Sequence, residues 1–286
     1  MRINLFNSAD PPLASIILLS CLLAGCSSKQ ELFNRKDLTG WDTYIGPTYD
    51  TAAQKFDKGK ISGVNSDPDR VFSVVEVDGK PAIRISGQHF GGISTTQEFF
   101  NYHLTLQFKW GSVKSHPRKK SKRDSGLLYH ANGAHAGDGS FWMRSQEFQI
   151  QEGDCGDYWG VAGALFDVPA IRKDSSEYVY APNGTLTTFM EGNEVGRHCM
   201  KNPDGEKPSG EWNTVELYCV GGTSVHVMNG MVTMVLFNSR QKIDGVTAEL
   251  TRGKIQIQSE GAEVFYRDLQ IEPIGSLPDG LVDGKR

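Results

Sequence analysis

The sequence predicts an all-β fold, a sandwich or jelly roll built from two sheets. Nearly every readable segment alternates apolar and polar residues, as a half-buried strand does. Tight turns containing Gly, Asn or Asp separate these segments. No segment beyond the N-terminal region keeps the 3.6-residue apolar period of an amphipathic helix. Many short strands joined by such turns are typical of sandwiches and jelly rolls.

Residues 1–25 are predicted to be a lipoprotein signal peptide. Arg2 supplies a positive charge, and the apolar run from Ile16 to Leu23 is too short to span a bilayer as a finished helix. The tetrapeptide Leu-Ala-Gly-Cys that ends at Cys26 resembles a bacterial lipobox, which would make Cys26 the lipidated first residue of an exported, membrane-anchored chain. Ser27 and Ser28, with no acidic residue at the next position, resemble the signal for export to the outer membrane, so a periplasmic or outer-membrane lipoprotein is expected, with the face of the membrane left open. The alternative is ordinary secretory cleavage, which would leave Cys26 free.

Residues 26–286 are expected to form one domain with its core at about 31–273, because all-β domains often reach this length undivided. The tail from Gly275 to Arg286 is expected to be loose. Three further cysteines, Cys155, Cys199 and Cys219, are an odd number and do not describe a disulfide framework. One bridge is possible in an oxidising compartment, and the fold should not depend on it.

The strands can be placed from their alternation and their turns. Asp78-Gly79 and Asn229-Gly230 are hairpin signals, because both central positions of a tight hairpin turn need positive φ. The predicted strands around these turns, and a long one before the basic segment, are Val71 to Val77, Ala82 to Ile85, Tyr102 to Trp110, Thr214 to Val220, Ser224 to Met228 and Met231 to Leu236.

The chain has 30 Lys and Arg against 34 Asp and Glu, a net charge of −4, so no global charge attracts nucleic acid. The exception is the basic segment 114–123. It contains a proline, lacks interleaved aromatics and lies between two strand patterns. These features favour a solvated loop over a polyanion-binding patch, and the loop could cover the rim of a site.

Two strands carry rows of polar side chains. Alternation places Glu147, Gln149 and Gln151 on one face of their strand, and Gln256, Gln258 and Glu260 on one face of another. A single row of this kind is usually a solvated sheet face. Two rows of carboxylate and amide groups indicate a face that holds a ligand rich in hydroxyl groups.

Further residues near the first row suggest specific chemistry. His130 is expected on the same face as Gly126 and Leu128, where it could bind a divalent metal together with Glu147 or could be an ordinary hydrogen-bonded histidine. The acidic, Gly-rich segment 152–157 could wrap a hard cation or form a plain turn. Arg144 and the aromatic residues Phe141, Trp142, Tyr158 and Trp159 could bind a sugar or simply pack at the rim.

Several enzyme classes are disfavoured. The Glu147 strand looks superficially like the catalytic strand of retaining β-glucanases, but its row offers one carboxyl group, and Glu152 points to the other face unless a bulge re-aims it. No Ser-His-Asp order, Walker loop, dinucleotide fingerprint or Cys-x-x-Cys motif is present.

Five segments follow one another along the chain: 32–41 (LFNRKDLTGW), 124–130 (DSGLLYH), 147–154 (EFQIQEGD), 210–213 (GEWN) and 253–269 (GKIQIQSEGAEVFYRDL). In this order they resemble the 3-keto-disaccharide hydrolase family, which was long called a domain of unknown function. The resemblance covers about Glu31 to Pro273. It implies a concanavalin-like jelly roll that acts on glycosides already oxidised at C3 of the sugar, and many members are exported lipoproteins.

This resemblance leads to a hypothesis of elimination, in which a base removes the C2 proton beside the ketone and the aglycone leaves C1. A divalent metal ion is expected to stabilise the enolate. The expected ligands are His130, Glu147 and Gln149, and Glu260 is the expected base, so that the catalytic set is Glu260, Glu147 and His130. The expected sugar-binding residues are Arg144, Trp142, Gln149, Gln151, Gln258, Arg267 and Trp159.

Two other functions remain open from the sequence. A non-catalytic carbohydrate-binding lipoprotein would use the aromatics and the Gln rows without a metal or a base. A structural protein with a solvated sheet would bind no ligand. The sequence does not separate elimination from direct hydrolysis, and it leaves the aglycone and the oligomeric state open. Arg267 could equally be an ion-pair partner of Glu260.

Overall fold

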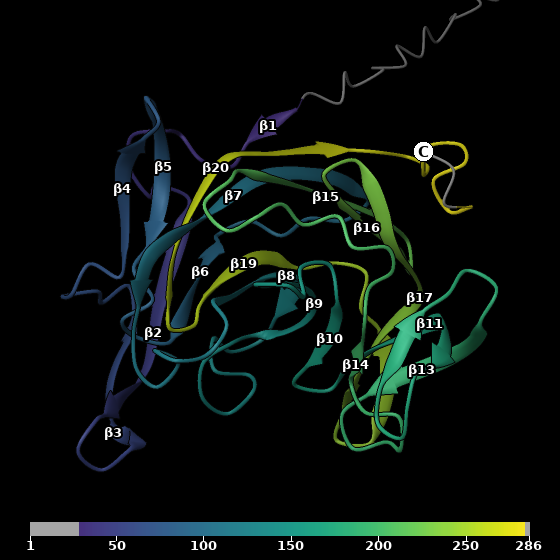
Figure 1. The fold of residues 1–286 in the computed structure, drawn as a ribbon, viewed down its shortest axis with the longest axis horizontal. Helices are drawn as coiled ribbons and strands as arrows, with labels where there is room; N and C mark the ends of the chain where they lie inside the picture. Colours follow the sequence, from purple (N-terminus) through teal and green to yellow (C-terminus); the bar gives the residue numbers. More distant parts are fainter. Residues whose placement is uncertain (1–28, 284–286) are drawn as a thin grey trace, which may run out of the picture.

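Residues 29–283 are described by a computed structural model of the protein, and they form strands, turns and loops without a helix. Within this range, no helix is therefore long and apolar enough to cross a membrane. The strands pair into two antiparallel sheets that stack face to face (Figure 1). This arrangement confirms the predicted all-β jelly-roll sandwich. The predicted signal peptide and its lipidation site, Cys26, lie outside the described residues.

The larger sheet has twelve strands, and its main path runs in the order β12-β11-β17-β16-β15-β7-β20-β5-β4. Three short strands join this path at its sides: β1 pairs with β20, β13 with β11 and β18 with β17. The strands are β1 (Gln30–Glu31), β4 (Phe72–Val77), β5 (Lys80–Ile85), β7 (Tyr102–Lys114), β11 (Ala164–Arg172), β12 (Tyr178–Tyr180), β13 (Thr185–Met190), β15 (Asn213–Val220), β16 (Thr223–Met228), β17 (Met231–Ile243), β18 (Val246–Glu249) and β20 (Ala262–Pro273).

The smaller sheet has eight strands in the order β14-β10-β9-β8-β19-β6-β2-β3. Strands β9 and β19 carry the two polar rows, and only β8 separates them. Segments more than a hundred residues apart in the chain therefore share one sheet face. The strands are β2 (Trp41–Asp50), β3 (Lys55–Val64), β6 (Gly91–Thr95), β8 (Asp124–Asn132), β9 (Arg144–Gln151), β10 (Tyr158–Val161), β14 (His198–Cys199) and β19 (Lys254–Ser259).

The hydrophobic core lies between the two sheets. On β7, Leu104, Leu106 and Phe108 are fully buried, while Thr105 and Gln107 between them point to the outer face and are only half-buried. The smaller sheet faces this layer with its own alternate residues, so its polar rows point away from the core. Its inward side chains include Leu127, Tyr129, Phe148, Ile150, Ile255 and Ile257.

The predicted hairpins form where the turn residues indicate them. Asp78 and Gly79 join β4 to β5 with φ of 51° and 72°, and Asn229 and Gly230 join β16 to β17 with φ of 51° and 81°. Both turns use the left-handed conformation that Asn, Asp and Gly tolerate best. The turn chemistry thus fixes the register of these strand pairs.

The C-terminal tail packs against the sandwich at Leu281. This residue is buried and belongs to the core cluster, so the prediction of a loose tail is wrong at this position.

The three cysteines of the sandwich are not linked by disulfides. Cys155, Cys199 and Cys219 are free and buried. Burial raises the pKa of each thiol, which keeps all three protonated.

Candidate active site

A pocket of about 270 Å³ opens on the outer face of the smaller sheet. A cavity of this size suits a single sugar ring better than a long polymer. It gathers residues of β8, β9, β10 and β19 with residues of four loops. Seven of the residues expected from the sequence line it: Trp142, Glu147, Gln149, Gln151, Trp159, Gln258 and Glu260.

Gly126 of β8 forms the floor between the two polar rows. It pairs with Gln149 on β9, and its neighbour Leu128 pairs with Glu147. A Cβ atom at position 126 would lie 2.3 Å from Glu147 Oε1 and 2.4 Å from Gln258 Oε1. The rows of β9 and β19 therefore converge above β8 because this position has no side chain.

Arg118 links two carboxyl groups at one end of the pocket. Its Nη2 lies 2.5 Å from Asp124 Oδ2, and its Nη1 lies 3.4 Å from Glu260 Oε1. Gln151 Nε2 donates a second hydrogen bond to Asp124 Oδ2, at 2.5 Å. Both contacts favour the ionised form of Asp124 over that of Glu260.

The carboxyl groups of the pocket differ in protonation. Burial raises the pKa of Glu147 to about 8, and the nearby Asp124 charge adds to this effect. Burial also raises the pKa of Asp124 to about 7, against the opposing charge of Arg118. The pKa of Glu260 is raised well above its usual range by burial and by the same neighbour. Because Arg118 and Gln151 stabilise the carboxylate of Asp124, the pair favours ionisation of Asp124 over that of Glu260.

The loop before β9 forms one wall of the pocket. Asp138 Oδ1 accepts backbone N–H groups of Ser140, Phe141 and Trp142 at 2.9, 2.7 and 3.1 Å, which fixes a tight turn. Trp142 Nε1 donates to the Gly91 carbonyl at 3.1 Å. The indole is thus anchored at its polar end, and its ring lines the pocket.

The opposite wall is an aromatic and cationic stack. The rings of Trp159 on β10 and His198 on β14 stack with centroids 4.3 Å apart. The Arg197 guanidinium lies 5.4 Å from the Trp159 ring. His198 is held by Asp157, with 2.8 Å between Nε2 and Oδ2. Two tryptophans therefore flank the carboxyl groups, an arrangement suited to stacking on a sugar ring.

The structure separates His130 from Glu147, contrary to the expected metal site. A bulge between Tyr129 and Asn132, with His130 at φ 52°, breaks the alternation of β8. The His130 ring turns into the core and packs against Tyr102 of the larger sheet, with centroids 6.0 Å apart. Burial lowers its pKa to about 3. The predicted pairing of His130 with Glu147 is therefore wrong, since the two side chains lie on opposite sides of the sheet.

Two predicted sugar-binding arginines also lie outside the pocket. Arg144 Nε donates to the Ala162 carbonyl at 2.8 Å, which ties it to the turn after β10. Arg267 lies on the outer face of the larger sheet, where its Nε donates to Gln107 at 2.8 Å and its guanidinium stacks 3.6 Å from the Trp212 ring centroid. Both residues have structural partners, and the predicted contact of Arg267 with the sugar or with Glu260 is wrong.

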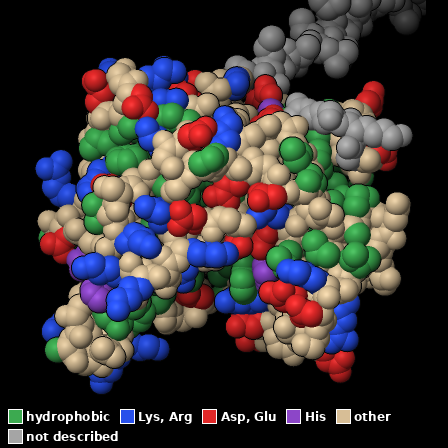
Figure 2. All heavy atoms as spheres, viewed as in Figure 1, with side chains coloured by type: hydrophobic (Ala, Val, Ile, Leu, Met, Phe, Trp, Pro, Cys, Tyr) green, Lys and Arg blue, Asp and Glu red, His purple; other side chains and the backbone are tan. Residues whose placement is uncertain are grey.

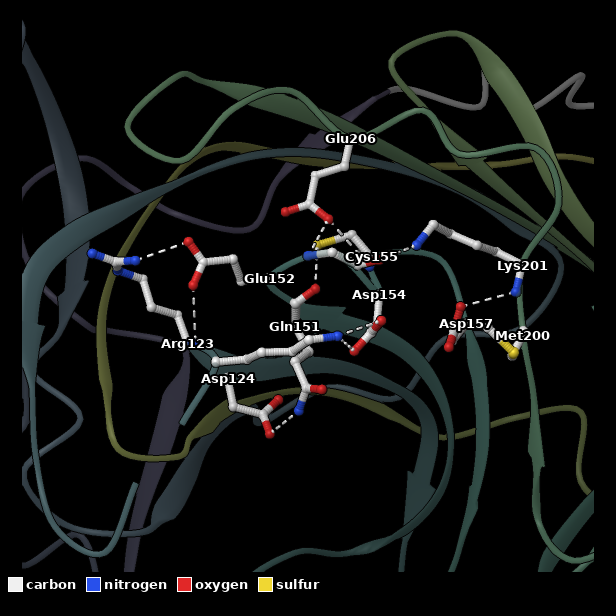
Figure 3. A network of polar contacts seen from close by, with 12 residues as sticks. Arg123, Asp124, Gln151, Glu152, Asp154, Cys155, Asp157, Met200, Lys201 and Glu206 are labelled. Atoms are coloured by element: carbon white, nitrogen blue, oxygen red, sulfur yellow. Dashed lines mark hydrogen bonds and ion pairs between the residues drawn. The ribbon is translucent and has the colours of Figure 1, made fainter. Parts of the chain in front are cut away.

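The acidic segment 152–157 forms a turn whose charges are already paired (Figure 3). Lys122 Nζ lies 2.7 Å from Asp154 Oδ2, and Lys201 Nζ donates to the Gly153 carbonyl at 2.7 Å. Glu206 accepts the backbone N–H groups of Gly153 and Cys155. These contacts favour the plain turn over a cation-binding loop, because lysines take the place that a cation would fill.

The sequence profile of a family described as the 3-keto-alpha-glucoside-1,2-lyase-like domain matches residues 28–272. The chain belongs to this family. The match covers the whole sandwich and every pocket residue, so the resemblance inferred from the sequence is confirmed. A comparison with curated proteins found no match.

Solved structures of similar shape share little sequence with this family member. A candidate glycosyl hydrolase from Parabacteroides distasonis has 18% identity and a TM-score of 0.48, and the match covers 86% of this chain and 94% of the other. A second one from the same organism has 16% identity and a TM-score of 0.48, with coverage of 86% and 100%. The carbohydrate-binding module CBM66 from Bacillus subtilis has 6% identity and a TM-score of 0.40, with coverage of 70% and 91%.

Besides Val161, four charged pocket residues were not expected from the sequence: Arg118, Asp124, Asp138 and Arg197. Asp124 precedes Gly126 by two positions, so alternation alone could have placed it on the pocket face. Arg118 lies in the basic segment, which was expected at most to cover the rim. Asp138 and Arg197 lie in loops, where no periodic pattern indicates direction.

Proposed function

We propose that this protein cleaves the glycosidic bond of 3-keto-glycosides by elimination followed by addition of water. One observation carries the proposal: the pocket holds a neutral carboxyl group, Glu147, beside an Asp124–Glu260 pair that shares Arg118. Elimination beside a ketone needs a base, an acid and a donor to the enolate oxygen, and these three groups can supply them. The family to which the chain belongs supports the same substrate class.

In the first step Asp124, the ionised member of the pair, removes the proton from C2 of the sugar. The C2–H electrons pass through the enolate into a C1–C2 double bond as the C1–O bond breaks. Glu260, the protonated member, gives its proton to the departing oxygen. Glu147 donates a hydrogen bond to the keto oxygen, where negative charge develops.

The second step returns both carboxyl groups to their starting states. Glu260, now ionised, takes a proton from water as the water oxygen bonds to C1. Asp124, now protonated, gives its proton to C2. The products are the 3-keto sugar and the free aglycone, and no proton is gained or lost by the protein.

The remaining pocket residues suit recognition of the sugar. Trp142 and Trp159 can stack on its ring, and Gln149 and Gln258 can bind its hydroxyl groups. A lectin would use these residues too, but it would gain nothing from three buried carboxyl groups, which cost folding free energy. The carboxyl groups therefore favour an enzyme over a binding protein.

The divalent metal ion expected from the sequence does not fit the residues present. Its expected nitrogen ligand, His130, lies in the core, and residues 29–283 contain no cluster of three His, Cys, Asp or Glu residues placed to hold a metal. The steps above therefore use none, and turnover is expected to persist in EDTA. Loss of turnover that an added divalent cation restores would return a metal to the mechanism.

Deuterium at C2 separates elimination from direct hydrolysis. When a chromogenic 3-keto-glucoside is cleaved in D₂O, the proton that Asp124 takes from C2 can exchange with solvent before it returns, so elimination should leave deuterium at C2 of the 3-keto sugar. Mass spectrometry at early times, beside a blank of the 3-keto sugar with the protein, measures the incorporation. Because the same proton can also return without exchange, single-turnover cleavage of a substrate deuterated at C2 is measured as well, and it should be slower than that of the protiated substrate. Release of the aglycone with neither deuterium incorporation nor this isotope effect would replace elimination by direct hydrolysis, and equal cleavage of the unoxidised glucoside would remove the need for the ketone.

The pH dependence should report the protonation of Glu147. Its folded-state pKa is raised to about 8, so the neutral form that donates to the keto oxygen is lost as pH rises through about 8. Activity on the acid side should fall as Asp124, with a pKa of about 7, takes up a proton. Both values belong to the ligand-free protein, so we expect a bell-shaped profile of kcat/KM with its maximum between them.

Glu147→Gln isolates the alkaline limb of that profile. The amide remains a neutral donor, so kcat/KM should stay within about tenfold of wild type and lose its fall above pH 8, whereas Glu147→Ala should lose about 10²–10³-fold. An alkaline limb that persists unchanged in Glu147→Gln would assign that limb to another group.

A further inference from the structure

The basic loop before β8 carries two lysines beside the pocket that no carboxylate neutralises. Arg118, the residue before them, lines the pocket, whereas Lys119 and Lys120 are exposed. Within residues 29–283, neither has a carboxylate at ion-pair distance. Their neighbours differ: Lys122 pairs with Asp154 at 2.7 Å, and Arg123 Nη1 lies 2.9 Å from a Glu152 oxygen. The two unpaired charges thus directly follow a residue that lines the pocket.

The β2–β3 hairpin adds to this positive surface. His116 of the basic loop stacks on Tyr49 of β2, with centroids 6.3 Å apart and ring planes within 4°. This contact holds the loop against the hairpin, whose Lys58 is also exposed and, among the described residues, without an ion-pair partner. Figure 2 shows Lys and Arg side chains gathered on this half of the face. We call Lys58, Lys119 and Lys120 the basic rim.

A chain of aromatic contacts fixes the basic rim relative to the pocket. Tyr49 contacts Phe56 at 5.2 Å between centroids, Phe56 contacts Phe141 at 4.9 Å, and Phe141 contacts Trp142 at 5.5 Å. Trp142 lines the pocket. The hairpin against which the basic loop packs and the wall of the sugar site therefore belong to one packed unit.

We propose that the basic rim receives an anionic group on the aglycone of the substrate. This inference rests on the proposed function, because it identifies the leaving group of that reaction. The chain as a whole has a net charge of −4, so the positive field is local to the pocket mouth. Unpaired lysines at the mouth of a pocket attract anions and bind them with a strength that salt screens. The carboxyl groups at the base of the pocket are held away from the rim by Arg118 and receive the uncharged sugar ring.

The test compares two substrates that differ in charge and little in shape, the 3-keto-glucosides of 4-hydroxybenzoate and 4-hydroxybenzamide. Chromatography measures release of each aglycone. At low ionic strength KM for the benzoate should be about tenfold lower, and 0.5 M NaCl should remove most of the difference. A third substrate made with 4-hydroxybenzenesulfonate shows whether the rim prefers a planar carboxylate or a tetrahedral anion.

The double variant K119Q/K120Q should raise KM for the benzoate about fivefold and leave the benzamide unchanged. The matched control K36Q/K80Q makes the same change in charge at two exposed lysines away from the pocket, and it should leave both values unchanged. Equal KM values for the two substrates in the wild type, or the same ratio in K119Q/K120Q, would overturn the inference. Cleavage of the benzamide tests the proposed function alone. If neither substrate is cleaved, their dissociation constants measured by calorimetry still decide the charge preference.

Discussion

Glu260→Gln and Asp124→Asn are each expected to lower kcat on a 3-keto-glucoside by about 10²–10⁴-fold, the usual contribution of a positioned acid or base. Gln keeps the size of Glu260 but cannot protonate the departing oxygen, and Asn cannot take the C2 proton. Substrate binding should change much less, because both amides still hydrogen-bond. Single-turnover kinetics beside calorimetric binding measures the two effects separately.

Glu263→Gln is the matched control for Glu260→Gln. Glu263 is also buried and also paired with an arginine, with 2.8 Å between Arg84 Nε and its Oε1, but it does not line the pocket. Its substitution can cost stability but should leave kcat within about twofold of wild type. A Glu260→Gln protein that folds and keeps full activity would remove Glu260 from the mechanism, and the same result for Asp124→Asn would remove the base.

Gly126→Ala is expected to lower kcat/KM by about 100-fold while the protein still folds. The new methyl group would lie 2.3 Å from Glu147 Oε1 and 2.4 Å from Gln258 Oε1, so both side chain ends must move. These ends are flexible, so the backbone can stay in place, but a displacement of about 1 Å in an active site can cost that factor. Steady-state kinetics together with thermal unfolding measures the loss of activity and the retained fold.

Gly92→Ala provides the comparison for Gly126→Ala. Its methyl group would meet the Gln256 side chain at 2.9 Å on the same sheet, and neither residue lines the pocket. Both substitutions therefore crowd a glutamine on β19, but only the one at position 126 reaches Glu147. Similar losses of activity in the two variants would attribute the effect to general strain in the sheet rather than to the site.

Local patterns in the sequence predicted the strands because alternation and turn residues are properties of neighbouring positions. They placed Glu147, Gln149, Gln258 and Glu260 on the correct face without information on the sheet order. The adjacency of β9, β8 and β19 depends on long-range pairing, which periodicity does not encode. The convergence of the two rows over Gly126 was therefore beyond a local analysis.

The errors have different physical causes, none of which local alternation encodes. His130 follows the alternation rule until a bulge at its own position reverses the direction of its side chain. Arg267 lies on the other sheet from the pocket, because the chain changes sheet between Glu260 and Arg267 at Gly261. Arg118 lies in a segment whose charge predicts solvent exposure. Its side chain nevertheless lines the pocket, because it pairs there with Asp124 and Glu260.

The position of β8 in the middle of the smaller sheet has a consequence for evolution as well as for mechanism. Its backbone is hydrogen-bonded to β9 on one side and to β19 on the other, so its paired amides should exchange with solvent only when the sandwich unfolds. The amides of the loops at 115–121 and 133–143 should exchange through local opening. The carboxyl groups that we propose as acid and base are then inherited with the stability of the fold. The loops around them can diverge at little thermodynamic cost, so, under the proposed function, new aglycones could be acquired without a change in the chemistry.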